Sequence, residues 1–154
     1  MSDSGLRAEF TGVSPFFIVD DVRRTAEWYR DHLGFTIGDY FSSDHGPEEG
    51  SDDPHNANHP AAGEALFVIV DHDGHRLMFS RSDAPGQGVF SVAQFKEYSS
   101  DAYFWLHDIR PYAAAVKATG AEIVEQLVAQ PYGLTEFRVR DCDGRIITFG
   151  GPSD

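Results

Sequence analysis

The sequence predicts an α+β fold made of two tandem βαβββ modules, whose curved sheets lie edge to edge around a concave pocket. Three observations predict it: an internal repeat, a helical pattern after the first strand of each copy, and a tight turn near the end of each copy. The repeat pairs 71–79 (DHDGHRLMF) with 141–149 (DCDGRIITF), and 19–22 (VDDV) with 106–109 (LHDI). Such self-similarity indicates one supersecondary unit used twice.

The first copy contains a strand, a helix, a strand and a hairpin. Residues 13–19 are β-branched and aromatic, which favours a strand. The following residues keep helical spacing after Asp20 or Asp21, either of which can cap the helix, and Gly34 is a typical C-terminal glycine. The turn Asp-His-Asp-Gly indicates a hairpin. Further strands are therefore expected at 35–41, 66–70 and 75–80.

The second copy repeats this order. A strand at 103–106 precedes a helix capped by Asp108, and the last three strands are expected at 121–128, 136–140 and 145–149. Between the copies, the segment 89–95 is expected to form a short helix or a lid. The predicted division is a tail at 1–11, a first module at 12–80 with a polar insertion at 42–63, a linker at 81–100 and a second module at 101–150, all within one structural domain.

The two-residue period of a strand sorts the side chains into two faces. One apolar set is predicted to lie under the helices: Val13, Phe17, Val19, Phe67, Ile69, Leu77, Phe79, Phe104, Leu106, Phe137, Val139, Ile147 and Phe149. The other set is predicted to face the pocket: Ser14, Phe16, Ile18, Leu66, Val68, Val70, Arg76, Met78, Ser80, Tyr103, Trp105, Glu136, Arg138, Ile146 and Thr148. Aromatic and apolar walls with a few polar groups are typical of a ligand pocket. Ligand, the other module or a second chain must cover this concave face.

Charge and composition narrow the partners. The 154 residues carry a formal net charge of −13, so we expect no nucleic acid and no anionic membrane surface as partner. A cationic or neutral small molecule is compatible with this charge. The single cysteine, Cys142, excludes an intrachain disulfide and a cysteine-rich zinc site. No apolar run is long enough to cross a bilayer, and the first residues lack signal-peptide features, so a cytoplasmic protein is expected.

Two runs of sequence resemble one known family. They are 17–22 (FIVDDV) continuing to 28–35 (WYRDHLGF), and 130–144 (QPYGLTEFRVRDCDG). With the repeat, they resemble the vicinal oxygen chelate superfamily of glyoxalase I, extradiol dioxygenases and bleomycin-resistance proteins, over about residues 12–150. The resemblance implies the glyoxalase/bleomycin-resistance fold. It leaves the activity open, because this fold hosts several chemistries and non-catalytic binders.

The resemblance also implies four concave positions where the metalloenzymes of the family carry His, Gln or Glu. Here those positions fall on Ser14, Met78, a residue near Asp101, and Thr148. A thioether is a soft ligand and neutral hydroxyls are weak ones. We therefore predict no metal and no cofactor. What remains resembles the bleomycin-resistance branch, a metal-free homodimer that sequesters a small molecule. Ser14, Met78 and Thr148 at three of the four positions favour a binding protein over an enzyme and leave catalysis open.

Seven residues are the predicted ligand contacts. The aromatic and apolar contacts are assigned to Phe16, Met78, Tyr103, Trp105 and Tyr132. Glu136 would recognise an amine of the ligand and Arg138 a carboxylate or phenolate. Simpler interpretations stay open: an exposed ion pair on an edge strand for the charged residues, dimer or core packing for Tyr103 and Trp105, and a turn residue for Tyr132.

The predicted function is binding of a small aromatic or cationic molecule, such as an antibiotic. The alternative is a metal-dependent lyase, isomerase or dioxygenase of the same superfamily, with ligands taken from Asp101, Glu136 and the histidines of the insertion. A third hypothesis is a metal-free lyase or isomerase with Glu136 as base. The insertion is interpreted as a solvated loop, although its acids and histidines could bind metal or a cation: Asp44, His45, Glu48, Glu49, Asp52, Asp53, His55 and His59.

Overall fold

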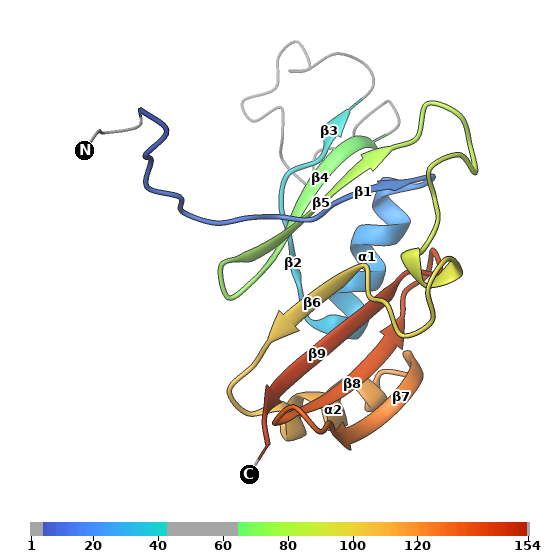
Figure 1. The fold of residues 1–154 in the computed structure, drawn as a ribbon. Coiled ribbons are helices and arrows are strands. Elements are labelled where there is room, and N and C mark those ends of the chain that lie inside the picture. Colours follow the sequence, from blue (N-terminus) through green and yellow to red (C-terminus); the bar gives the residue numbers. More distant parts are fainter. Residues whose placement is uncertain (1–4, 43–64, 154) are drawn as a thin grey trace.

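A computed structural model describes residues 5–42 and 65–153. Nearly all of the polar insertion therefore lies outside the described residues. The predicted α+β fold is confirmed: the described chain forms two separate curved sheets and two α-helices (Figure 1). Among the described strands, none of one sheet is hydrogen-bonded to a strand of the other.

The first module contains one helix and a mixed sheet. Its elements are β1 (Phe16–Val19), α1 (Val22–Leu33), β2 (Thr36–Ile37), β3 (Phe41–Ser42), β4 (Ala65–His72) and β5 (His75–Arg81). The strand order is β1-β5-β4-β2, with β3 also paired to β4. β1 runs parallel to β5, whereas β2, β3 and β5 run antiparallel to β4. A 3₁₀ helix, η1 (Val92–Gln94), lies in the linker that follows.

The second module repeats the arrangement. Its elements are β6 (Ala102–Trp105), α2 (Ile109–Ala118), β7 (Glu122–Ala129), β8 (Leu134–Arg140) and β9 (Ile146–Pro152), in the strand order β6-β9-β8-β7. β6 runs parallel to β9, as β1 does to β5. The internal repeat of the sequence is thus a repeat of strand topology.

Helix α1 begins and ends where the sequence predicts. The Asp21 side chain accepts a hydrogen bond from the Arg24 amide at 3.1 Å, which satisfies one donor of the first turn. Gly34 ends the helix with φ of 78°, a left-handed conformation that glycine adopts without steric cost. At α2, Asp108 occupies the capping position but its side chain makes no capping bond.

The helix-covered faces of both sheets contribute to a single hydrophobic core. The sequence correctly predicts its buried members Phe17, Val19, Leu77, Phe79, Phe137, Val139, Ile147 and Phe149. The Phe35 and Phe104 rings, one from each module, lie 5.7 Å apart in an edge-on contact. Because the core joins the modules through these faces, their concave faces point away from it.

The structure corrects the predicted faces at two places. Val13 precedes β1 and its side chain is 92% exposed, within an extended arm that leaves the body of the protein (Figure 1). In β4, the predicted pocket-facing residues Val68 and Val70 lie in the core instead and are fully buried, whereas Leu66 is half-buried. The concave residues of β4 are therefore Phe67 and Ile69, which lie opposite Ser80 and Met78.

The β4 error arises at the hairpin turn. Ile69 lies opposite Met78, whereas Arg138 lies opposite Thr148, the repeat partner of Met78. The β8–β9 connection is thus one residue longer than the β4–β5 connection, so Ile69, not Val68, corresponds to Arg138. A one-residue shift moves every side chain of a strand to the opposite face.

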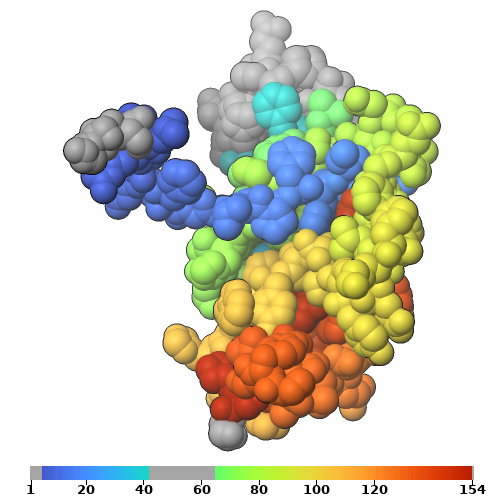
Figure 2. All heavy atoms as spheres, viewed as in Figure 1, coloured from blue at the N-terminus to red at the C-terminus, as the bar shows by residue number. Residues whose placement is uncertain are grey.

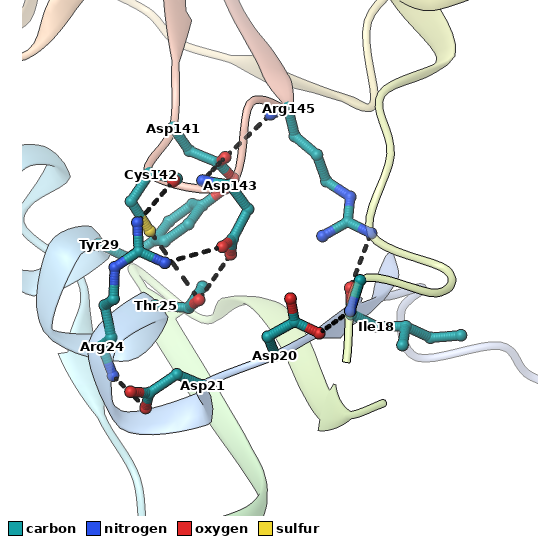
Figure 3. A network of polar contacts seen from close by, with 11 residues as sticks. Ile18, Asp20, Asp21, Arg24, Thr25, Tyr29, Asp141, Cys142, Asp143 and Arg145 are labelled. Carbon is teal, nitrogen blue, oxygen red and sulfur yellow. Dashed lines mark hydrogen bonds and ion pairs between the residues drawn. The ribbon is translucent and has the colours of Figure 1, made fainter. Parts of the chain in front are cut away.

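A polar junction joins α1 to the turn between β8 and β9 (Figure 3). Tyr29 Oη donates to Asp141 Oδ2 at 2.5 Å, and Thr25 Oγ1 donates to Asp143 Oδ2 at 2.6 Å. Arg145 Nη2, from the same turn, donates to the carbonyl oxygen of Ile18 at 2.8 Å. Burial raises the pKa of the Cys142 thiol to about 12, so this thiol stays protonated near neutral pH. The junction is therefore a structural contact between modules.

Candidate functional site

The concave face of the second sheet holds a polar cavity of about 380 Å³, within the range of small-molecule pockets. In Figure 2, the gold side chains of β6 stand beside the orange and red atoms of β8 and β9 that form this side of the molecule. The lining residues come from the linker and from four strands with their connections: Tyr98, Ser100, Tyr103, Glu125, Gln130, Tyr132, Glu136, Arg138 and Thr148.

Two tyrosines hold the Glu136 carboxylate. Tyr103 Oη donates to Glu136 Oε2 at 2.5 Å, and Tyr132 Oη donates to Oε1 at 2.7 Å. Glu136 is only 6% exposed, whereas Tyr132 is 62% exposed and lies at the mouth of the cavity. Burial together with the bond to Glu136 raises the pKa of Tyr103, and the bond to Glu136 raises the pKa of Tyr132 to about 12. Both phenols therefore remain neutral donors at physiological pH.

Gly150 makes the Tyr103 contact possible. Tyr103 lies on β6 and Glu136 on β8, with β9 between them. The phenol must therefore pass over β9, where Gly150 lies opposite Glu136. A Cβ atom at position 150 would collide with the Tyr103 hydroxyl. Because residue 150 has no side chain, the Tyr103 phenol can cross β9 and reach the Glu136 carboxylate.

Arg138 is a buried cation with an unsatisfied donor. The residue is 8% exposed, and its Nη2 donates to the carbonyl oxygen of Ser99 at 2.9 Å. Its Nε is buried and has no hydrogen-bond partner among the described residues. Buried polar atoms are nearly always paired, so the hydrogen bonds of Arg138 are incomplete within the described residues.

The linker contributes a wall that sequence reasoning missed. The ring of Tyr98 lies 5.6 Å from the Arg138 guanidinium carbon, and Tyr98 adopts φ of 68°, a strained conformation for a residue with a side chain. Tyr98, Glu125 and Arg138 also line a neighbouring cavity of about 580 Å³. From the sequence, no ligand contact was expected at Tyr98. The nearest expectation was a short helix or a lid at 89–95, in the same linker.

The structure divides the seven predicted ligand contacts between regions. Tyr103, Tyr132, Glu136 and Arg138 lie together in the polar cavity. Trp105 is 73% exposed, and its ring lies 4.9 Å from that of Tyr103, outside this cavity. The remaining two, Phe16 and Met78, are neighbours on the first sheet and do not line it.

A model of the Glyoxalase/Bleomycin resistance protein/Dioxygenase superfamily matches residues 13–149. The chain belongs to this superfamily. Two solved structures of the glyoxalase-superfamily fold resemble it over nearly their whole lengths. TioX from Micromonospora sp. ML1 is 21% identical with a TM-score of 0.63, covering 94% of this chain and 100% of TioX. A glyoxalase-related enzyme from Clostridium phytofermentans is 15% identical with a TM-score of 0.66, covering 95% and 98%.

A third similar structure is the bleomycin-binding protein from bleomycin-producing Streptomyces verticillus, complexed with copper(II)-bleomycin. It is 18% identical with a TM-score of 0.60, and the match covers 96% of this chain and 100% of that protein. At these identities the similarity shows the fold. No curated protein sequence matches the chain. In the described part of the chain, no helix is long and apolar enough to cross a membrane.

The superfamily's metal positions carry side chains that do not fit a divalent metal. Phe16 lies opposite Met78, and Tyr103 opposite Thr148, so Asp101 is the counterpart of Ser14. Asp101 already accepts bonds at 2.6–2.9 Å from the Ser91 hydroxyl and the amides of Val92 and Ile146, and Thr148 is bonded to Ser100. In residues 5–42 and 65–153, no three His, Cys, Asp or Glu side chains cluster as a metal site.

Proposed function

We propose that this superfamily member is a non-catalytic binding protein that sequesters a small aromatic molecule bearing an acidic group and an amine. The observation that carries the proposal is the pair of buried, opposite charges in the polar cavity, one with an orphan donor and the other held by two phenols. Buried charges without a full set of partners are costly, and a ligand that completes the set relieves that cost.

Arg138 supplies the anion subsite. Its guanidinium can donate from several N–H groups in one plane, which matches the geometry of a carboxylate. One donor, Nη2, is used by Ser99, and no described residue accepts from Nε, so the guanidinium has donors left for an acid in the cavity that Arg138 lines. The Tyr98 ring lies beside the guanidinium and would cover a planar acidic group bound there.

Glu136 supplies the cation subsite. The two phenol bonds fix the orientation of its carboxylate. Each carboxylate oxygen keeps a second acceptor site, so an ammonium group can bind between the tyrosines. The faces of aromatic rings attract cations as well, which favours an amine in this position.

The binding form we propose is a homodimer. On the concave face of the first sheet, Phe16 is 58% exposed and Ile18 is 41% exposed. Apolar residues gathered on an exposed face mark an interaction surface. A second copy would cover this face and close the pocket. The fold shared with a protein that binds copper(II)-bleomycin supports an antibiotic as ligand.

The test is a titration with a panel of aromatic antibiotics that includes bleomycin-type compounds. Binding is measured by the change in Trp105 fluorescence and by calorimetry. We expect one saturable site per chain. Arg138→Met should weaken binding about 30-fold or more, since a buried charged contact is worth about 2–5 kcal/mol. The matched control is Arg140→Met on the same strand, which removes an exposed arginine paired with Glu122 and should leave the affinity unchanged.

The proposal would be wrong if no compound of the panel changed the fluorescence or gave heat of binding. Equal loss of affinity in Arg138→Met and Arg140→Met would also contradict it. Turnover of a bound compound, measured by chromatography of the ligand after incubation, would replace the non-catalytic proposal with an enzymatic one.

A further inference from the structure

A further cavity, of about 490 Å³, lies at the seam between the modules. The turn of the β4–β5 hairpin and β6 lie close to one another there (Figure 1), and Figure 2 shows the gold side chains of β6 below the green hairpin. Three groups of residues line this seam cavity: 13–15 before β1, the hairpin turn with Phe35, and 102–106 with Tyr112. None of the acidic or basic residues of the polar cavity lines it; Tyr103 is the only residue that the two linings share.

We propose that the seam cavity binds a flat, uncharged aromatic molecule of two or three fused rings. A cavity of about 150 Å³ lined by apolar side chains accepts benzene, so the larger seam cavity has room for two or three rings. The site lies apart from the anion and cation subsites, and the inference does not rest on the function proposed above.

Ring geometry in the wall favours a flat occupant. The Phe35 ring meets the His72 ring at 76° with centroids 5.4 Å apart, and the His72 ring meets that of Tyr112 at 89° and 5.9 Å. Phe35 also meets Phe104 edge-on. Edge-on contacts leave ring faces and edges available, and an added aromatic ring packs well against both. On the concave side, Trp105 adds a further ring at the mouth.

The polar groups of the wall favour an uncharged occupant. Inside the cavity, the Tyr112 hydroxyl is already bonded to the Leu33 carbonyl at 2.7 Å. At the mouth, Arg76 is 61% exposed and paired with Asp71, and Asp73 is 88% exposed and pairs with His72. Exposed, already paired charges contribute little to binding. A charge carried past the mouth, to the part of the cavity lined by Phe35, Ala102 and Phe104, would lose its hydration without gaining a partner.

The decisive experiment compares 2-naphthol, which is neutral at pH 7, with 2-naphthalenesulfonate, which carries the same rings and a charge. Calorimetry should give one 2-naphthol site per chain, and the sulfonate should bind at least about tenfold more weakly. Ala102 lines the cavity and is 8% exposed, so Ala102→Leu should fill it and abolish 2-naphthol binding. Ala115→Leu on the exposed face of α2 is the matched control and should bind normally.

A second blocking variant guards against misfolding of the first. Leu106→Trp places a large ring in the same cavity from the other end of β6, and it should also abolish binding. Arg138→Met should bind 2-naphthol as the unmodified protein does, since Arg138 lies in the polar cavity. Loss of binding in Arg138→Met would overturn the proposal, because the probe would then occupy the polar cavity. Normal binding in both blocking variants, or equal affinity for the sulfonate, would overturn it as well.

Discussion

The two concave faces share one backbone register and differ in chemistry. Phe16 and Met78 on the first sheet correspond to Tyr103 and Thr148 on the second. By the same register, Phe67 and Ile69 correspond to Glu136 and Arg138. One copy of the repeat thus has an apolar concave face, and the other has a charged and hydrogen-bonded one. The duplicated fold thus carries two different surface chemistries on one backbone topology.

The largest effect is expected when the concave face of the second sheet is given the apolar residues of the first. Glu136→Phe combined with Arg138→Ile should reduce affinity for the antibiotic identified by the panel about a hundredfold or more, because both charged contacts are lost. The free energy of unfolding should fall by about 1.5–3 kcal/mol, because Tyr103 and Tyr132 lose their acceptor while the desolvation cost of two buried charges is removed. Calorimetry and denaturant unfolding measure the two effects.

A large fall in the stability of this double variant would show that the charges hold the second module together. The corresponding double variant of the first face, Phe67→Glu with Ile69→Arg, is a poor control because it adds charges without the tyrosines that hold them. Reversion of one site at a time gives the separate contributions and their coupling.

A smaller effect is expected when one charge is placed on the apolar face. Ile69→Arg should weaken the proposed homodimer by about ten- to a hundredfold, because an unpaired charge would be buried at the interface. Sedimentation measured over a range of concentrations gives the dissociation constant. Ala115→Arg, on the exposed face of α2, should leave it unchanged. An unchanged dimer in Ile69→Arg would place the interface elsewhere.

The comparison also shows what the sequence could and could not predict. The order of elements along the chain follows from the repeat, and the faces of β1, β5, β6, β8 and β9 follow from their own alternation. The predicted faces of β4 were wrong because residues 65–70 are all apolar, so alternation does not distinguish the two faces, and the β8–β9 turn is one residue longer, so the repeat does not align β4 with β8. Local patterns carry no information on such a difference in turn length.

The side-chain contacts of the polar cavity were only partly predictable. Alternation predicted that Tyr103, Glu136 and Arg138 share one face of the sheet. In the structure, all three line the polar cavity. The bond from Tyr103 to Glu136 was not predictable, because it crosses an intervening strand and depends on the absence of a side chain at Gly150. Tyr98 was missed because its position results from a strained backbone conformation in the linker.

Gly150 allows a sharper test of the difference between the faces. Its counterpart in the first module is Ser80, which lies opposite Phe67 as Gly150 lies opposite Glu136. Gly150→Ser should displace Tyr103 and lower the free energy of unfolding by about 1.5–3 kcal/mol, the net value of a hydrogen bond to a charged group. Thermal and denaturant unfolding measure this loss.

Two further variants assign the loss to the Tyr103 bond. In a Tyr103→Phe background that bond is already absent, so Gly150→Ser should cost much less there. Gly12→Ser adds the same side chain where a Cβ meets nothing within 4 Å, and it should have no effect. If Gly150→Ser lowered the free energy of unfolding equally in both backgrounds, Gly150 would be required by the backbone and not by the Tyr103 bond.

The smallest effect expected is on the ionisation of Tyr132. Donation to Glu136 raises its pKa to about 12, so Glu136→Gln should lower that pKa toward the ordinary value of about 10. A phenol with a raised pKa in the folded state stabilises the fold below about pH 10, and this contribution is lost as the pH rises through about 12. The variant should therefore lose less stability between these two pH values than the unmodified protein does.

Absorbance titration of tyrosinate measures the shift directly, and Tyr132→Phe identifies which transition belongs to this residue. Tyr132 is 62% exposed, so solvent screens the interaction and the change in stability will be smaller than the change in pKa suggests. Phe67 occupies the position of Glu136 on the first sheet and has no acceptor for a phenol. An unchanged Tyr132 transition in Glu136→Gln would mean that the carboxylate does not hold Tyr132 in solution, and the cation subsite would then lose one of its two walls.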